Sequence, residues 1–133
     1  MREILFRGKT FITKKMVTGT GILYDGTNTW IVNNEPPKAL AFGMEHYTVI
    51  PETIGQYTGL TDKNGTQIFE GDIVNFKTTA YHFKNCRIKY QSCYARYCAI
   101  DNKGYEYPMD KTFEYEVIGN IHDNPELLKE LGK

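Results

Sequence analysis

The stretch that decides the fold class is Gln56–Phe76, which reads QYTGLTDKNGTQIFEGDIVNF. Short segments rich in Thr, Tyr, Ile, Val and Phe, the residue types that favour strands, alternate here with turn-forming residues. Asn64-Gly65, between two such segments, is the strongest hairpin signal in the chain and is typical of a type I′ turn. Gly71 then interrupts the pattern before a new apolar segment begins. The stretch therefore predicts consecutive short antiparallel strands.

The same alternation of apolar segments and turns continues on both sides of this stretch. Asp25–Asn28 separates two apolar segments, which predicts a hairpin with a four-residue loop. Cys86–Gln91 alternates apolar with polar residues, which predicts a strand whose alternate residues, Tyr90 among them, point inward. Asn124, followed by a proline and an apolar segment, predicts the N-cap of a short helix. We therefore expect a mainly β protein with a short C-terminal helix.

At 133 residues, the chain is long enough to bury a real core. Its short strands suggest a small barrel or sandwich, because closing a sheet removes exposed edges. The composition changes at Ile50-Pro51, and Pro51–Gly55 can form a single helical turn. We expect a β-rich N-terminal extension at residues 1–50, not stable alone, and a barrel with the terminal helix at residues 51–133.

The charge balance and the cysteine count limit the classes of partner and the cellular compartment that we expect. Lys and Arg total 16 and Asp and Glu total 16, so the overall charge indicates neither a polyanion partner nor an acidic tail. No apolar run resembles a secretory signal or is long enough to cross a bilayer. The 3 cysteines cannot all pair within the chain, which favours a reducing compartment. We expect a cytoplasmic protein without membrane contact.

Gln56–Phe76 resembles the YopX family of phage and prophage proteins. The resemblance extends to Arg2–Ile4, to Val49–Gly55 and to the closing segment Tyr115–Leu128, whereas Thr78–Met109 lies outside it. It implies a C-terminal SH3-like barrel with an N-terminal extension, encoded in a mobile element and present in the cytoplasm of a bacterial host. It implies no established activity, because a small barrel serves as a scaffold for many unrelated functions.

Motifs for the common catalytic chemistries are absent from the sequence. It has neither a Gly-x-Ser-x-Gly elbow nor a phosphate-binding Gly-x-x-x-x-Gly-Lys loop. Asp72 follows Gly71 in a conspicuous turn, where the simplest interpretation is a side-chain hydrogen bond to nearby amides. We therefore assign no catalytic residue and expect no cofactor. An enzyme whose site is assembled from distant strands would leave no local motif.

A weak metal alternative lies within residues 82–98. The residue types that bind zinc there are His82, Cys86, Cys93 and Cys98. Structural zinc sites usually contain Cys-x2-Cys pairs, which this spacing lacks, and an odd separation places Cys86 and Cys93 on opposite faces of a strand. Small buried thiols are the simpler interpretation, so we expect no metal site.

Residues 76–97 carry cations and aromatic rings but no acid. Cations neutralise phosphates and rings stack on bases, so this composition is typical of single-stranded nucleic-acid binding on a small barrel. The candidate nucleic-acid or partner-binding residues are Lys84, Arg87, Lys89, Tyr94 and Arg96. Residues 101–116 are rich in Asp and Glu, and adjacent strands that paired these acids with the bases would leave an ordinary solvated face. Both interpretations stay open at this point.

The leading functional hypothesis is a non-enzymatic protein-interaction or self-assembling module of a phage or prophage. The short N-terminal segments leave strand edges that another chain can extend. The partner would be a host protein, a phage protein or a second copy, and in the last case the chain forms a homo-oligomer. A nucleic-acid-binding barrel that uses residues 76–97 is the alternative, and an enzyme without a local motif ranks third.

Overall fold

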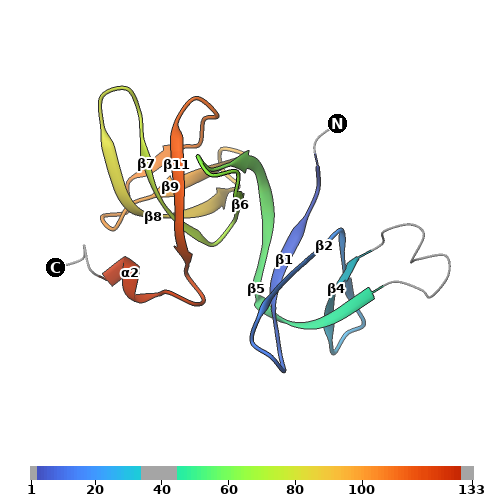
Figure 1. The fold of residues 1–133 in the computed structure, drawn as a ribbon. Helices are drawn as coiled ribbons and strands as arrows, with labels where there is room; N and C mark the ends of the chain where they lie inside the picture. Colours follow the sequence, from blue (N-terminus) through green and yellow to red (C-terminus); the bar gives the residue numbers. More distant parts are fainter. Residues whose placement is uncertain (1–2, 34–44, 130–133) are drawn as a thin grey trace. The chain divides into compact units, whose positions relative to one another are not determined.

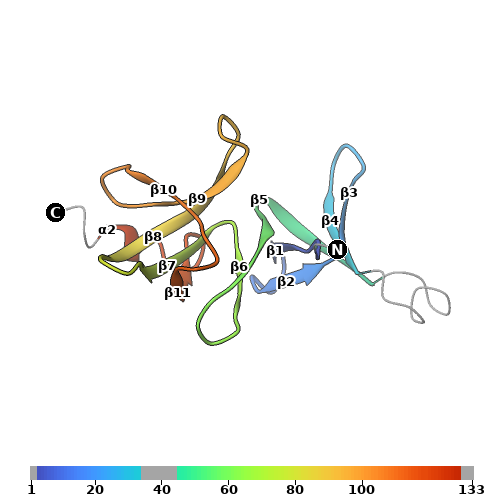
Figure 2. The same cartoon turned by 90° about the horizontal axis from the view of Figure 1, so that it is seen from above.

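The computed structural model describes residues 3–33 and 45–129, which form antiparallel strands and a short helix (Figure 1, Figure 2). The prediction of a mainly β protein with a short C-terminal helix is confirmed. The chain divides into two compact units, Met1–Tyr57 and Thr58–Lys133, and strand β5, Glu45–Thr61, contributes to both. In the described part of the chain, no helix has the length and apolar character needed to span a membrane.

The first unit is an antiparallel sheet with the strand order β2-β1-β5-β4-β3. Its other strands are β1 (Phe6–Thr10), β2 (Met16–Gly19), β3 (Gly21–Tyr24) and β4 (Thr29–Asn33). The predicted hairpin at Asp25–Asn28 is confirmed, because it joins the paired strands β3 and β4. The Asp25 carboxylate accepts hydrogen bonds from the N–H groups of Thr27 and Asn28, at 2.8 and 2.7 Å. Ile31 and Val49 are fully buried within this unit.

The predicted helical turn after Ile50 is wrong, because β5 continues through it as extended chain with a bulge. The pairing with β1 shifts here, and the Thr53 hydroxyl donates to the Ile50 carbonyl at 2.6 Å. The same hydroxyl accepts a hydrogen bond from the Lys9 N–H at 2.8 Å. Pro51 has no N–H to donate, so a bulge accommodates it without loss of a ladder bond. The predicted boundary after Ile50 thus falls inside β5, and the two units divide after Tyr57.

The second unit is a five-stranded sheet with the order β10-β9-β8-β7-β11, and the short strand β6 pairs with β5. The strands are β6 (Gln67–Phe69), β7 (Asp72–Lys77), β8 (His82–Gln91), β9 (Arg96–Ile100), β10 (Glu106–Pro108) and β11 (Glu114–Asn120). The buried core cluster consists of Ile68, Val74, Phe76, Cys86, Ile88, Ala99 and Tyr115. Phe76 lies at its centre, with its ring 4.6 Å from the ring of Phe83 and 5.5 Å from that of Tyr115.

The ladder of the second unit is open, whereas the sequence predicted a small closed barrel. Within the described residues its hydrogen-bonded order ends at β10 on one side and β11 on the other. Strand β10 has only 3 residues, and Pro108 lacks the N–H group that a further ladder bond requires. The core is closed instead by the hairpin of β5 and β6, from which Ile68 and Leu60 pack into it.

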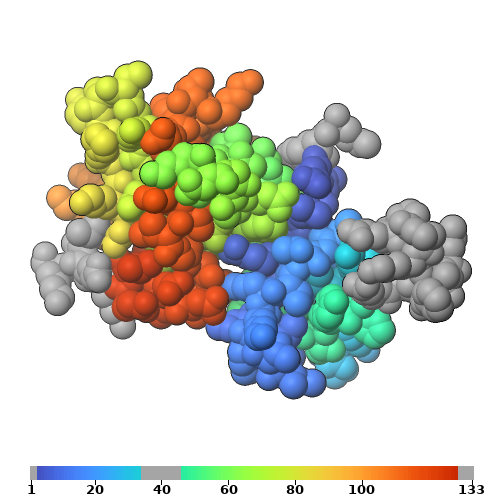
Figure 3. All heavy atoms as spheres, in the orientation of Figure 1, coloured from blue at the N-terminus to red at the C-terminus, as the bar shows by residue number. Residues whose placement is uncertain are grey.

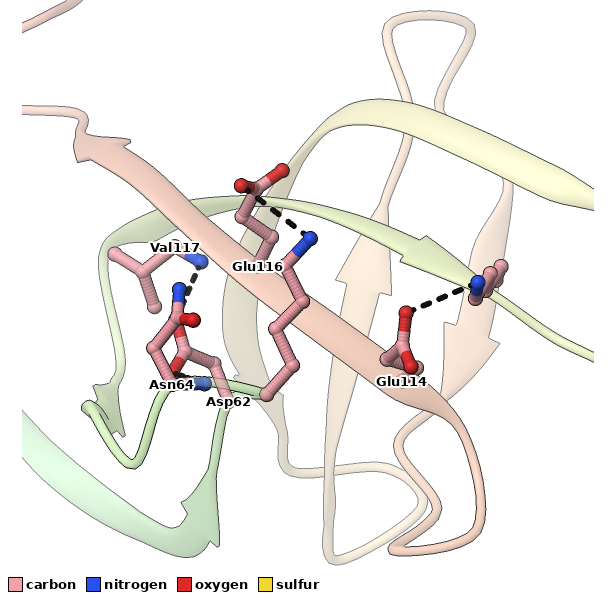
Figure 4. A network of polar contacts seen from close by, with 7 residues as sticks. Asp62, Asn64, Glu114, Glu116 and Val117 are labelled. Atoms are coloured by element: carbon pink, nitrogen blue, oxygen red, sulfur yellow. Dashed lines mark hydrogen bonds and ion pairs between the residues drawn. The ribbon is translucent and has the colours of Figure 1, made fainter.

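Asp62 ties this hairpin to β11 (Figure 4). One carboxylate oxygen accepts hydrogen bonds from the N–H groups of Asn64 and Thr66 at 2.8 and 2.9 Å, and the other accepts one from Val117 at 3.0 Å. Burial of the side chain acts to raise the pKa of Asp62, but the hydrogen bonds from Val117, Thr66 and Asn64 together lower the pKa below its ordinary value. The carboxylate therefore stays ionised and joined to both elements.

The hairpin itself forms where Asn64-Gly65 predicted it, with a different turn. The Gly65 N–H donates to the Asp62 carbonyl at 3.0 Å, and Gly65 has a φ of 85°. Asn64 is not among the residues with positive φ, which a type I′ turn requires at both central positions. The turn therefore has only Gly65 in the left-handed region, and Asp62, through its three side-chain hydrogen bonds, selects this geometry.

The terminal helix α2 occupies Glu126–Lys129 in the described residues. The predicted cap is wrong in detail, because the Asn124 side chain accepts a hydrogen bond from the Asn120 N–H at 3.2 Å instead of from the helix. The Asn124 backbone carbonyl accepts the Leu127 N–H at 3.1 Å. Gly119 makes this arrangement possible, since a Cβ at that position would lie 2.6 Å from the Asn124 Oδ1.

Replacing Asp62 with Asn tests the connection between hairpin and sheet. Asp62→Asn exchanges one acceptor oxygen for an NH2 group, so one of the amides now bonded loses its partner. We expect the free energy of unfolding at neutral pH to fall by about 1–3 kcal/mol. Because the folded-state pKa is lowered, the wild-type contribution is complete above the unfolded-state pKa of about 3.9 and is lost as the pH falls through the folded-state pKa.

Urea unfolding across this pH range measures both effects. As the pH falls, the free energy of unfolding should decrease less for the variant than for the wild type, because the variant lacks the carboxylate that becomes protonated. Glu52→Gln removes an exposed carboxylate from the first unit and serves as the control, with an expected change near zero. Equal stability of wild type and Asp62→Asn at neutral pH would contradict the role of Asp62.

Candidate functional site

Strand β8 has one face in the core, and its other face is only partly exposed, because Ile73, Cys98 and Ile100 are buried there on the neighbouring strands. Cys86 and Ile88 are buried in the core cluster, whereas Arg87 and Lys89 are exposed. This arrangement confirms the alternation predicted for these four residues, because successive side chains of a strand point to opposite faces. The two cations therefore lie side by side on the outer face of the sheet.

A bulge in β8 adds Lys84 to the same face. The register with β7 shifts between Val74 and Phe76, where β8 carries one residue more than its partner. The extra residue is Asn85, which has a φ of 53°. Phe83 stacks on Phe76 in the core, so its neighbour Lys84 points outward.

Strand β9 contributes Arg96 to the outer face. Lys89 lies opposite Cys98 and Gln91 lies opposite Arg96, so Lys89 and Arg96 are on the same side of the sheet. The Arg96 guanidinium lies over the Tyr94 ring, 4.6 Å from its centroid. Tyr94 is 57% exposed in the turn between the strands, so its ring is accessible from solvent.

We call this surface the basic face, and its members are Lys84, Arg87, Lys89, Tyr94 and Arg96. The structure thus brings the five predicted residues together on one side of β8 and β9. At about 3.3 Å per residue, the row along β8 from Lys84 to Gln91 is roughly 20 Å long. The loop end of the hairpin of β7 and β8, yellow in Figure 3, lies at the molecular surface.

Two acids near this surface form ion pairs with other lysines (Figure 4). Glu114 lies 3.1 Å from the Lys77 Nζ, and Glu116 lies 3.6 Å from the Lys63 Nζ. Both pairs border a shallow hollow of about 240 Å³ that Lys84 also lines. The acids of β11 are therefore paired, but not with the basic face.

The carboxylates of Asp101 and Asp110, in the loops before and after β10, accept hydrogen bonds from backbone N–H groups of their own loops. The Asp101 carboxylate accepts hydrogen bonds from the N–H groups of Lys103 and Tyr105, at 2.9 and 3.0 Å. Asp110 accepts one from the Thr112 N–H at 2.8 Å. Over residues 3–33 and 45–129, no ion pair within 4.0 Å involves a cation of the basic face. The expected pairing of these acids with the basic segment is therefore observed at Lys77 with Glu114, but for none of the five members of the basic face among the described residues.

The four candidate zinc ligands do not converge. Cys86 is buried in the core, Cys98 is buried on the other face of the sheet, and His82 and Cys93 are exposed. Burial, together with the charge of Asp101, raises the pKa of Cys86 to about 12, which keeps this thiol protonated and a poor metal ligand. Among the described residues, no three His, Cys, Asp or Glu side chains gather in a geometry suited to a metal ion.

Asp72 has the structural role that the sequence suggested. It is 1% exposed, and one carboxylate oxygen accepts a hydrogen bond from the Phe69 N–H at 2.8 Å. This bond fixes the turn between β6 and β7. The buried carboxylate is thus a turn-stabilising group with no opening to a substrate.

A second hollow of the same unit was missed from the sequence. It has a volume of about 390 Å³ and is lined by Thr58, Leu60, Arg96, Tyr97, Met109 and Lys111. These residues come from distant parts of the chain, so no local motif connects them. Tyr90 lies on the predicted side of β8, the side of Ile88, but it is not buried: it is 40% exposed, and its ring contacts Tyr97 beside this hollow.

Comparisons with known proteins agree with this description. The family model described as YopX protein matches residues 5–129. Among solved structures, the crystal structure of protein EF1440 from Enterococcus faecalis is similar, with 26% identity and a TM-score of 0.52 over 94% of this chain and 97% of that chain. No curated protein matches at a significant level. Because the family match spans nearly the whole sequence, the chain belongs to the YopX family.

Proposed function

We propose that the protein is a non-enzymatic binding module of a phage or prophage, and that its basic face binds single-stranded nucleic acid in the bacterial cytoplasm. The observation that carries this proposal is the set of cations on the basic face, which form no ion pair within the described residues. Membership of the YopX family supports the phage or prophage setting. The proposal also explains why an aromatic ring lies exposed among these cations.

The chemistry of the basic face suits a single strand. Cations neutralise phosphates and release condensed counterions, which favours binding of any polynucleotide. The Tyr94 ring, with the Arg96 guanidinium over it, offers a platform on which an unpaired base can stack. A base must be unpaired and unstacked to lie on this platform, so the exposed ring favours a single strand over a duplex.

We also propose that the second unit is an open variant of the SH3-like small barrel. Its five short antiparallel strands around one core, completed by the hairpin of β5 and β6, support this proposal. Small barrels commonly bind ligands on a strand face without performing chemistry. The turn-stabilising role of Asp72 and the protonated Cys86 thiol are consistent with a non-enzymatic function.

The first test measures oligonucleotide binding by fluorescence anisotropy at several salt concentrations. Four phosphate contacts on a single strand predict a slope of log affinity against log salt of about −3. Lys84→Gln, Arg87→Gln and Lys89→Gln combined should reduce this slope to about −1 and abolish most binding at low salt. These three exposed side chains point away from the core, so the variant should fold normally.

The matched control changes the same net charge outside the basic face. It combines Lys14→Gln, Lys15→Gln and Lys103→Gln, which replace exposed lysines that do not line the hollow that Lys84 shares with Glu114 and Glu116. This control should bind the oligonucleotide nearly as well as the wild type. An unchanged anisotropy of the wild type at low salt, or equal losses in both variants, would refute the proposal.

A second candidate function is self-association through the first unit, and the exposed strand β3 favours it. This strand is last in the order β2-β1-β5-β4-β3, so one of its edges has no strand partner in the described residues. It reads Gly-Ile-Leu-Tyr without a charge, and Leu23 and Tyr24 are 49% and 69% exposed. An uncharged edge can pair with an identical edge around a two-fold axis without repulsion between like charges.

Light scattering at high micromolar concentration tests this pairing. The wild type should show the mass of a dimer, and Leu23→Lys should shift it to the monomer, because a charged side chain on a strand edge opposes pairing. Thr79→Lys, an exposed change in the turn between β7 and β8, should leave the dimer intact. A wild-type protein of purely monomeric mass would exclude self-association.

A further inference from the structure

The hollow beside the start of β9 has a preformed apolar floor. Leu60 and Met109 are partly buried against the core cluster, and the Met109 N–H donates to the Tyr97 carbonyl at 3.2 Å. The ring of Tyr97 is in edge-to-face contact with that of Tyr90, with centroids 5.1 Å apart. The floor is therefore held by strand pairing and core packing, and its volume of about 390 Å³ is within the range of small-molecule sites.

The rim of this hollow carries positive charge. Arg96 and Lys111 both line it and are exposed, and the lining includes no acid. Neither cation makes an ion pair with another described residue; the Arg96 guanidinium contacts the Tyr94 ring instead. A ligand that enters this hollow therefore meets two cations that form no ion pair within the described residues, although the Asp110 carboxylate lies near enough to Lys111 to feel its charge.

The combination of floor and rim defines the class of ligand. A flat aromatic group can lie against Leu60, Tyr97 and Met109, burying apolar area and contacting a ring. A phosphate attached to that group can then reach Arg96 and Lys111, with which it forms charge-assisted hydrogen bonds. We propose that this hollow is a nucleotide site, in which the base occupies the floor and the phosphate binds between the two cations.

This inference rests on the proposed function and makes it more specific. Arg96 belongs both to the basic face and to the rim of the hollow, which lie on opposite sides of the sheet, so a strand that passes from the basic face around the turn between β8 and β9 can place one nucleotide here. The basic face would then supply contacts to the backbone, and the hollow would hold a single base out of the stack. A free nucleoside monophosphate has the same chemistry as that one unit of the strand.

The experiment follows backbone amide resonances of the full chain by NMR during titration with adenosine monophosphate, adenosine or inorganic phosphate. Adenosine monophosphate should shift the amides of Leu60, Tyr97, Met109 and Lys111 at millimolar concentration, and adenosine or phosphate alone should do so more weakly. Lys111→Gln should reduce the affinity for the monophosphate about five- to tenfold, because one charge-assisted contact is lost. Lys103→Gln, in a loop outside the hollow, is the control and should have no effect.

An oligonucleotide titration separates this inference from the proposed function. If the strand binds and shifts these same amides, the nucleotide site is part of the strand-binding surface, as proposed. If the strand binds but these amides stay unchanged and the monophosphate does not shift them, the hollow is not a nucleotide site, while the proposed function stands. If the monophosphate binds the hollow and no strand binds, the hollow takes free nucleotides and the proposed function fails.

Discussion

The bulge at Asn85 is the constraint on which the arrangement of the second unit depends. Strand side chains alternate between faces, so a shift of one residue would exchange the buried and exposed sides of β8. The bulge is held from two directions: the Asn85 N–H donates to the Asn75 Oδ1 at 3.0 Å, and its side-chain amide donates to the Leu127 carbonyl at 2.6 Å. On a regular strand, Phe83 and Cys86 would point to opposite faces, because they are three positions apart. The extra residue in the bulge removes this conflict, so both side chains pack in the core. The same geometry directs the cations of the basic face outward, so core packing and surface charge are determined together.

The features that could be predicted from the sequence are those encoded over a few residues. The alternation in Cys86–Gln91 and the turn residues at Asp25–Asn28 identified a strand and a hairpin correctly, because neighbouring residues alone determine them. The errors arise where a distant group intervenes. The Asn124 side chain binds the end of β11 because Gly119 leaves room for it, and the turn at Asn64 follows the hydrogen bonds of Asp62. No local sequence pattern could predict the hollow that Leu60 and Lys111 both line, because these two residues are some fifty positions apart in the chain.

Strand order explains why the acids of β11 do not pair with the basic face, although Glu106 of β10 lies on the same side of the sheet. The sequence places the acidic segment directly after the basic one, which suggests neighbouring strands. In the structure, however, β11 crosses to the far side of the sheet and pairs with β7. Glu114 and Glu116 therefore meet Lys77 and Lys63, and the neighbour of β9 is the three-residue β10, on which Glu106 accepts a hydrogen bond from Gln91. Sequence order does not determine strand order in a sheet, so composition alone could not distinguish a solvated face from a binding face.

A chain with no net charge can still present a cationic surface when its acids have structural roles. Asp25, Asp62 and Asp110 each accept hydrogen bonds from backbone N–H groups of their own turns, and those hydrogen bonds lower the pKa of each carboxyl group. For the partly desolvated Asp62, this effect outweighs the opposing effect of burial. These carboxylates stay ionised, yet they point into turns and not along strand faces. The cations have no corresponding role in the turns, because Lys and Arg side chains cannot accept hydrogen bonds from backbone N–H groups. Four cations therefore remain on the outer face of β8 and β9 without an ion pair among the described residues. At physiological ionic strength their potential extends about 8 Å from the surface before salt screens it. A phosphate chain must therefore come close to this face to be attracted to it.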